Sequence, residues 1–282
     1  MLSALVRDNV APLVPEFIRP WTILRGGANG FIRKVEVDFK VRDYRVKTVE
    51  SPAELKQVLA LRRSVFHYEF AGKWLSLRSD QDEFDVHADH LAIFDEKSGV
   101  VAGVYRLIAS EFAAPFYSAT EFDISKFLGS PGSKLELSRA CIDRRYRNGA
   151  VITLLWRGIA EYAKRAKVDY LFGLSSINTV DLEPIAEIHR YFADSGLVSE
   201  AFGISPRGKY RIDGFEQAFA RTTAGKGEAP SAMPALFKTY IKAGAKVCSQ
   251  PVIDRDFNCA DWLTVLDMGG MVAAYDKKYM RD

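Results

Sequence analysis

A cluster of arginines and a glycine lies between a predicted strand, KLELSRACI, and a predicted amphipathic helix, within residues 134–166. The turn between them holds Arg144, Arg145, Arg147, Asn148, Gly149 and Ala150. A helix N-terminus offers free backbone N–H groups and a partial positive charge. Gly149 lets the backbone approach a ligand closely. The pattern therefore predicts a phosphate-binding turn, and an ordinary solvated turn is the alternative.

The segment YRNGAVITLLW resembles the acyl-carrier phosphate loop of the GNAT superfamily of acyltransferases, whose usual pattern is R-x-x-G-x-[G/A]. Arg147 lies one residue too close to Gly149, and Val151 stands where a second small residue is expected. This departure fits the single phosphodiester of an acyl carrier protein (ACP) arm better than the pyrophosphate of coenzyme A. The resemblance implies acyl-ACP, with its phosphopantetheine arm, as donor substrate. A coenzyme A thioester is the alternative donor, and we expect no bound cofactor.

Five segments carry a second, more specific resemblance: LRRSVFHYEF, DQDEFD, HADHLAIF, GVYRLI and LELSRACI. Together they resemble acyl-homoserine-lactone synthases and the ornithine-lipid-forming N-acyltransferases. In those families an R-x-x-x-F helix end, a D-x-x-D segment, a strand arginine and an E-x-S-R strand build the acyl-donor and amine sites. The matching residues here are Arg62, Phe66, Asp82, Asp85, Arg106, Glu136 and Arg139.

The resemblance implies acyl-donor binding by Arg62, Phe66, Arg106 and the basic turn. Asp82 and Asp85 would bind the acceptor. Together with Asp80 and Glu83, these carboxylates could hold the ammonium groups of a basic amino acid, or they could form a merely solvated acidic loop. Arg62 lies on the apolar stripe of a predicted helix, where a guanidinium needs a partner. A site residue and a structural ion pair are both open readings of Arg62.

Glu136 and Arg139 are the predicted catalytic residues. N-acylation needs a base to accept the amine proton and hydrogen-bond donors that face the oxyanion. Glu136, on the strand that leads to the basic turn, would be that base, directly or through a water; structural pairing with Arg139 or Arg106 is the alternative. In a regular strand Glu136 and Arg139 face opposite sides, whereas a β-bulge near Ser138 would bring them to one side.

The C-terminal segment MPALFKTYIKAGAKVCSQPVIDRDFNCADWLTVLD resembles the ornithine-lipid branch, including proteins labelled hemolysin-like. The resemblance covers residues 44–270 and implies transfer of a (3-hydroxy)fatty acyl group from acyl-ACP to the α-amine of an amino acid, ornithine first. The enzyme alternative is an acyl-homoserine-lactone-like or other N-acyl-amino-acid signal synthase. The alternative from another class is a non-catalytic acyl-carrier-binding or membrane-associated module.

The elements that must position these residues form an α/β pattern, and the resemblance implies a GNAT-type fold, a mixed central sheet flanked by helices. A helix should begin at Ser51-Pro52-Ala53-Glu54, which has the sequence of a capping box. Residues 1–40 are predicted as an arm that packs on its own domain or a dimer mate, with a peripheral membrane contact as the alternative. Residues 41–282 are the predicted acyltransferase domain, with a loop or lid at 203–230 and a C-terminal extension at 231–282.

Composition sets the broad class. The 282 residues are 48% hydrophobic and 27% charged, as in a globular protein with a core, and the net charge of +3 is too small to indicate nucleic-acid binding. The three cysteines are far apart, and the histidines have no metal-ligand spacing, so we expect neither disulfides nor a metal. No apolar run is long enough to span a membrane. These features favour a cytoplasmic protein, with association at the inner membrane face as a variant.

Overall fold

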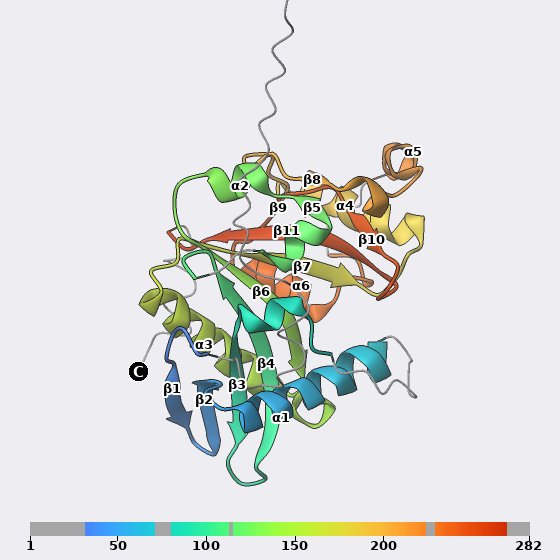
Figure 1. Ribbon diagram of the computed structural model, residues 1–282. Coiled ribbons are helices and arrows are strands. Elements are labelled where there is room, and N and C mark those ends of the chain that lie inside the picture. Colours follow the sequence, from blue (N-terminus) through green and yellow to red (C-terminus); the bar gives the residue numbers. More distant parts are fainter. Residues whose placement is uncertain (1–31, 71–79, 113–114, 224–228, 270–282) are drawn as a thin grey trace, which may run out of the picture.

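A mixed sheet runs through the part of the chain that the computed structural model describes, residues 32–70, 80–112, 115–223 and 229–269. Its strand order is β1-β2-β3-β4-β6-β7-β11-β10, and β9 pairs with β11 (Figure 1). The strands are β1 (Asp38–Val41), β2 (Tyr44–Thr48), β3 (Asp89–Asp95), β4 (Val100–Ala109), β6 (Lys134–Ile142), β7 (Tyr170–Ile177), β9 (Lys246–Val247), β10 (Val252–Asp254) and β11 (Cys259–Asp267). A separate pair joins β5 (Phe122–Asp123) to β8 (Ser205–Pro206).

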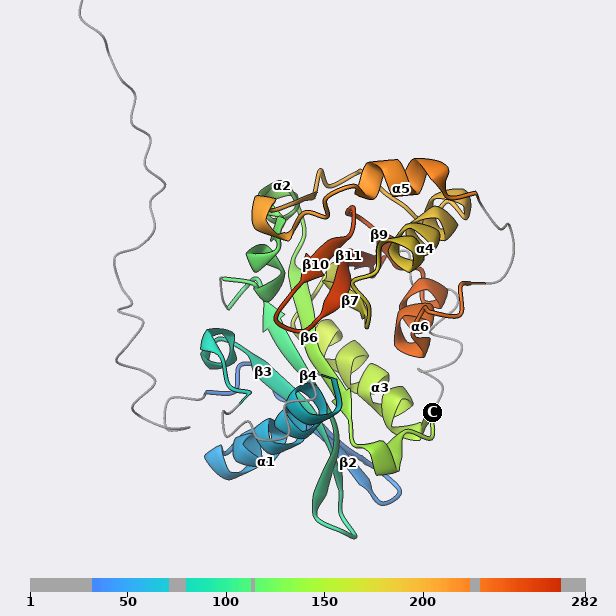
Figure 2. The same cartoon turned by 90° about the vertical axis from the view of Figure 1, so that its right-hand side faces the viewer.

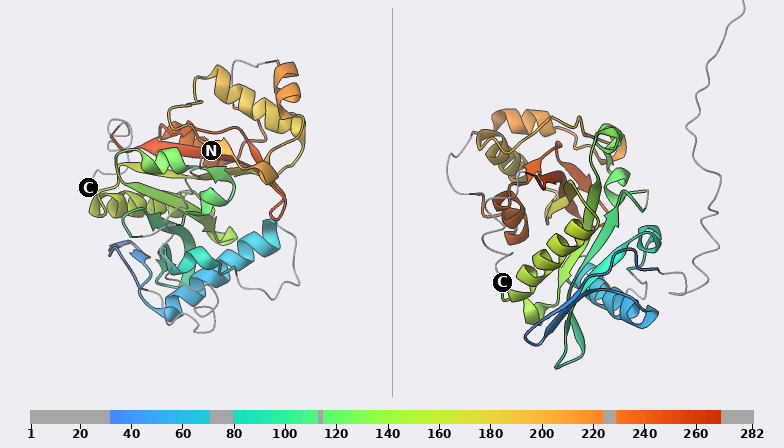
Figure 3. Two further views of the ribbon diagram at one scale, coloured as in Figure 1. Left: turned by 45° about the horizontal axis from the view of Figure 1, so that its top comes forward. Right: turned by 90° about the vertical axis from the view of Figure 1, so that its left-hand side faces the viewer.

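Helices cover both faces of the sheet, which confirms the predicted architecture. α1 (Pro52–Arg63) packs on one face of β3, β4 and β6, and α3 (Ala150–Arg165) packs on the opposite face (Figure 2). The other helices are α2 (Ser125–Gly129), α4 (Leu182–Asp194), α5 (Phe215–Arg221) and α6 (Ala235–Lys242), with shorter turns η2 (Ser64–Phe70), η3 (Glu83–Val86), η4 (Tyr117–Thr120), η5 (Arg144–Tyr146) and η6 (Gly208–Tyr210). α4 and α5 pack together over the C-terminal strands (Figure 3).

Helix α1 begins as the sequence predicts, with one difference. The Ser51 hydroxyl accepts the Glu54 backbone N–H at 3.2 Å, and Pro52 opens the helix. The Glu54 carboxylate accepts the backbone N–H of Glu50 at 3.0 Å, one residue before the position that a capping box would use. The α-helix ends at Arg63, and the chain continues directly into the π-helical turn η2. Such turns are frequent at functional sites.

Strands β6 and β7 diverge after a short parallel contact. Their pairing joins residues 134–136 to residues 170–172. Beyond it, β6 pairs with β4 on its other edge, and β7 pairs with β11. Gly173 lies where the strands separate, and a Cβ on it would lie only 2.2 Å from the Leu137 carbonyl oxygen. A residue without a side chain is therefore required at the apex of this fork.

The C-terminal segments complete the sheet. The segment PALFKTYIKAG contains α6, and the segment ADWLTVLDM contains most of β11, which pairs along the full length of β7. Residues 231–269 thus supply three sheet strands, although we predicted an extension. The predicted loop or lid at 203–230 contains β8, η6 and α5, and β1 begins before the predicted boundary at residue 40. Residues 1–31, most of the predicted arm, lie outside the described residues.

Candidate active site

Arg62 is fully buried and forms ion pairs with two aspartates. Its Nε donates to Asp80 Oδ2 at 2.7 Å, its Nη1 donates to Asp85 Oδ1 at 2.6 Å, and its Nη2 donates to the Asp80 carbonyl oxygen at 2.8 Å. Burial alone would raise the pKa of Asp85, but the charges and hydrogen bonds of its neighbours, Arg62 foremost, together outweigh burial and hold that pKa below its usual range. Of the two readings of Arg62, the structure shows the ion pair.

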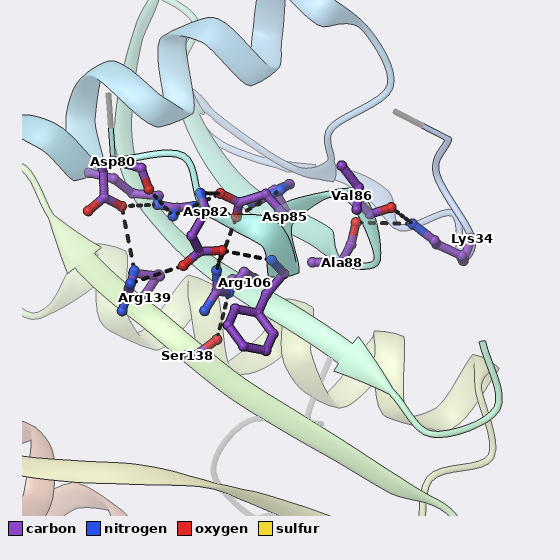
Figure 4. A network of polar contacts seen from close by, with 12 residues as sticks. Lys34, Asp80, Asp82, Asp85, Val86, Ala88, Arg106, Ser138 and Arg139 are labelled. Atoms are coloured by element: carbon purple, nitrogen blue, oxygen red, sulfur yellow. Dashed lines mark hydrogen bonds and ion pairs between the residues drawn. The ribbon is translucent and has the colours of Figure 1, made fainter. Parts of the chain in front are cut away.

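Two further arginines extend these ion pairs into a network. Arg106 Nη1 donates to Asp82 Oδ1 at 2.5 Å and to Asp85 Oδ1 at 3.2 Å, and Arg106 Nε donates to Ser138 Oγ at 2.9 Å. Arg139 Nη2 donates to Asp82 Oδ2 at 3.0 Å (Figure 4). Three arginines therefore face three carboxylates, and the charges of the network balance.

These contacts differ from the acceptor-binding role predicted for Asp82 and Asp85. Asp85 is 2% exposed, and Asp82 also closes the N-terminus of η3 by accepting the Phe84 backbone N–H. Neither carboxylate lines the cavity described below. Carboxylates already neutralised by arginine have little attraction left for a substrate ammonium group.

A β-bulge lies near Ser138 in β6, at the place where the sequence analysis considered one. The register against β4 shifts between the pairs Val104–Cys141 and Arg106–Ser138, so β6 carries one extra residue there. Arg139 takes up the bulge with a left-handed φ of 51°. Its guanidinium lies 4.6 Å from the ring centre of Tyr117, whose backbone N–H binds Glu136. Glu136 and Arg139 therefore approach the same turn, η4.

Glu136 binds backbone N–H groups instead of an arginine. Its Oε2 accepts the Tyr117 N–H at 2.7 Å, and its Oε1 accepts the Ser118 N–H at 2.6 Å. The side chain is fully buried, and burial raises its pKa despite these hydrogen bonds. A carboxylate offers about four lone-pair sites, so each oxygen can accept a second hydrogen bond.

The fork between β6 and β7 opens into a cavity of about 280 Å³. Residues 137–140 of β6 and Leu174, Ser175 and Ser176 of β7 form two walls, and α6 covers the cavity with Leu236, Phe237 and Tyr240. The predicted donor residue Phe66 lines the cavity, edge-to-face with Phe257 at 6.3 Å between ring centres. Of the predicted residues, Phe66 and Arg139 contact this space, whereas Arg62, Arg106 and Glu136 lie behind its wall.

One end of the cavity is acidic, which the sequence analysis missed. Asp254 and Asp261 line it, and the carboxylate of Glu121 lies within 4.8 Å of theirs. All three side chains are buried. Burial, reinforced by the neighbouring carboxylates, raises the pKa of Glu121 to about 9. Burial also raises the pKa of Asp261 to about 6, against hydrogen bonds from Ser176 and Cys259.

The basic turn leads directly into the N-terminus of α3. Gly149 precedes α3 with a φ of 90°, and no side chain at that position caps the helix. Arg144 and Arg145 are exposed, although Arg145 also pairs with Asp143 at 2.7 Å. Arg147 pairs with Glu69 at 2.8 Å. Asn148 accepts the Ala150 N–H at 3.1 Å, so the turn is preformed while its positive charge remains accessible.

His90 and His189 are buried. Burial lowers the pKa of His90 to about 3 and that of His189 to about 4. His189 Nδ1 accepts the Trp262 indole N–H at 3.2 Å, so both histidines are neutral near neutral pH.

In the described part of the chain, no helix is both long and apolar enough to cross a membrane.

Known proteins extend this description. Residues 61–157 match the acetyltransferase (GNAT) domain family. An L-ornithine N(alpha)-acyltransferase from Rhodobacter capsulatus is 30% identical over 84% of this chain and 95% of its own length. Its namesake from Agrobacterium fabrum is 31% identical over 72% of each chain. A solved CoA-dependent acyl-homoserine lactone synthase is 14% identical over 80% of this chain and 82% of its own, with a TM-score of 0.47.

The matched domain contains β3, β4, β6 and the first half of α3, so it includes one wall of the cavity and the basic turn. The Rhodobacter capsulatus relative matches 84% of this chain, well beyond the residues that the domain family covers. The chain therefore has the GNAT acyltransferase fold, is an acyltransferase, and belongs to the family of L-ornithine N(alpha)-acyltransferases.

Proposed function

We propose that this enzyme transfers a (3-hydroxy)fatty acyl group from acyl-ACP to the α-amine of ornithine and so makes a lyso-aminolipid. The observation that carries the proposal is the cavity in the β6–β7 fork, which has an apolar wall and an acidic end. An acyl thioester needs the apolar wall, and a cationic amino acid needs the acidic end. The relatives named above bear the name of the same reaction.

The donor enters from the side of the basic turn. β6 runs from the cavity wall at residues 137–140 to that turn within a few residues. A phosphodiester at the N-terminus of α3 would be held by backbone N–H groups and by Arg144 and Arg145. The phosphopantetheine arm then extends between β6 and β7, whose facing edges are not paired with each other beyond residues 136 and 172. There the amide groups of the arm form hydrogen bonds with the unpaired backbone groups of the two strands.

The reaction forms an N–C bond and breaks the C–S bond of the thioester. The amine nitrogen attacks the carbonyl carbon, its proton passes to a base, and the leaving thiolate takes a proton. We assign the base to Glu136, acting through a water, because burial raises its pKa and its oxygens keep free lone pairs. Arg139 lines the cavity and supplies positive charge near the developing oxyanion.

Lipid analysis of cells tests this proposal. The chain is overexpressed in a host that makes no ornithine lipid, and amine-containing lipids are analysed by mass spectrometry. We expect a series of species with the masses of ornithine amide-linked to a 3-hydroxy fatty acid. Expression of the Glu136→Gln variant serves as the control. An unchanged lipid profile, or acylation of a different amine, would contradict the assignment.

A further inference from the structure

Three carboxylates at the acidic end of the cavity come from three different elements. Asp254 ends β10, Asp261 lies within β11, and Glu121 directly follows η4. Their exposed fractions are 6%, 2% and 1%, and their carboxylate oxygens lie within 4.8 Å of one another. Like charges this close in a buried site repel strongly unless a cation or protons compensate them.

The charge of Arg139 acts on Glu121 and Asp261, but it does not offset their burial, so the pKa of each stays raised. Within the described residues, none of the three carboxylates forms an ion pair with a lysine or arginine, and Glu121 Oε2 has no hydrogen-bond partner. The nearby Arg139 is directed to Asp82. The other acidic triad, at Asp80, Asp82 and Asp85, is filled by three arginines. The contrast indicates that the cavity cluster is left open for a cation from outside the chain.

An alkylammonium group fits this cluster better than a metal ion does. An ammonium group has three N–H donors, one for each carboxylate. Calcium and magnesium prefer six or more oxygen ligands. Here fewer carboxylate oxygens are free to coordinate a metal ion. Asp261 already accepts hydrogen bonds from Ser176 and Cys259. Asp254 already accepts the backbone N–H groups of Asp256 and Phe257.

The position of the cluster matches the length of a diamino acid. Asp261 pairs with Ser176, and Leu263, two residues further along β11, pairs with Leu174 on the wall of the fork. Two residues of strand span about 7 Å. That length is comparable with the extended ornithine side chain. An acceptor whose side-chain nitrogen lies among the carboxylates therefore brings its α-amine to the place where the fork receives the thioester.

We propose that Glu121, Asp254 and Asp261 bind the side-chain ammonium group of the acceptor and thereby select a diamino acid over neutral amino acids. This inference rests on the proposed function, whose acceptor site it locates. The raised pKa values of Glu121 and Asp261 agree with it, because a bound ammonium group relieves the repulsion that keeps these acids protonated. Binding of the acceptor should release protons.

Specificity constants for ornithine and norvaline test the proposal. Norvaline has the carbon chain of ornithine without the side-chain amine. We expect the purified enzyme to prefer ornithine, and we expect Asp261→Asn and Glu121→Gln each to lower kcat/KM for ornithine about tenfold to a hundredfold. The preference for ornithine over norvaline should fall by the same factor. Asp267→Asn, an exposed position on the same strand, is the matched control and should keep the preference.

Each other outcome overturns the proposal. Equal losses for both acceptors would place the α-amine at the cluster, and an unchanged ratio would leave the cluster outside acceptor binding. Activity lost to EDTA and restored by calcium or magnesium would make it a metal site. Calorimetry without donor separates this proposal from the proposed function. If ornithine binds more tightly than norvaline but no acyl transfer occurs, the reaction assignment fails and the site stands; if both bind alike, the site fails.

Discussion

At the scale of single residues, Glu136 links the catalytic proposal to the fold. Replacing it with glutamine removes the base and also turns one acceptor of the Tyr117 and Ser118 N–H groups into an amide. We expect Glu136→Gln to lower kcat by roughly 10²–10⁴-fold, the usual contribution of general-base catalysis. Rates are measured per folded molecule, with the Tm of each sample. A variant that melts lower yet keeps its rate would show that Glu136 only holds η4.

Glu121 should make stability depend on pH. Its pKa is raised to about 9, so between pH 4.5 and 9 the folded chain keeps a proton that the unfolded chain loses, and stability falls as pH rises. The charged groups that set this pKa are Asp261, Asp254, Glu136 and, in the opposite direction, Arg139.

Glu121→Gln removes this titration. The variant should match the parent near pH 4.5 and exceed its free energy of unfolding by about 1–3 kcal/mol at pH 8. Urea titrations at several pH values measure the difference. Curves that run parallel across the whole range would contradict the raised pKa. A variant with a higher free energy of unfolding and a lower kcat/KM for ornithine would show that Glu121 supports function at the expense of stability.

At the scale of elements, the arginine–aspartate network connects η3 and residues 80–82 before it to α1, β4 and β6 through ion pairs. Asp85 accepts from Arg62, Arg106 and the Asp82 backbone N–H. Asp85→Asn leaves buried guanidinium groups with too little negative charge, and we expect a loss of about 3–5 kcal/mol in the free energy of unfolding.

Exposed Glu83 in the same turn gives the control for this prediction, and Glu83→Gln should change stability by less than about 0.5 kcal/mol. Chemical denaturation compares the two variants. If Asp85→Asn kept full stability but raised KM for the amino acid alone, the acidic segment would bind the acceptor after all.

Some of this arrangement was predictable from the sequence and some was not. Arg62 lies on the apolar stripe of a helix and therefore needed a buried partner. Glu136 and Arg139 would face opposite sides of a regular strand, so only a bulge could bring them to one side. Helix and strand periodicities fix both of these relations locally. Asp261 gave a weaker signal, a carboxylate between Ala260 and Trp262 in an apolar strand. Glu121 gave none. Its approach to Asp261 depends on how η4 packs against β11, which no local pattern encodes.

At the scale of the whole molecule, charge should govern the encounter with the donor. Arg144 and Arg145 are exposed beside the N-terminus of α3 and can attract an acidic carrier protein. We expect the double change Arg144→Ala and Arg145→Ala to raise KM for acyl-ACP and to weaken its dependence on salt, while KM for ornithine stays the same. Lys164→Ala, exposed at the other end of α3, is the control. Equal effects of the two variants would contradict a docking role for the basic turn.

The most direct test of the central claim is turnover by the purified protein. The enzyme is incubated with ornithine and either 3-hydroxyacyl-ACP or the matching coenzyme A thioester, and products are identified by mass spectrometry. We expect Nα-acylated ornithine together with free ACP thiol in equal amounts, at a higher specificity constant with the ACP donor. Thiol release without an ornithine amide, or acylation at the side-chain nitrogen, would contradict it.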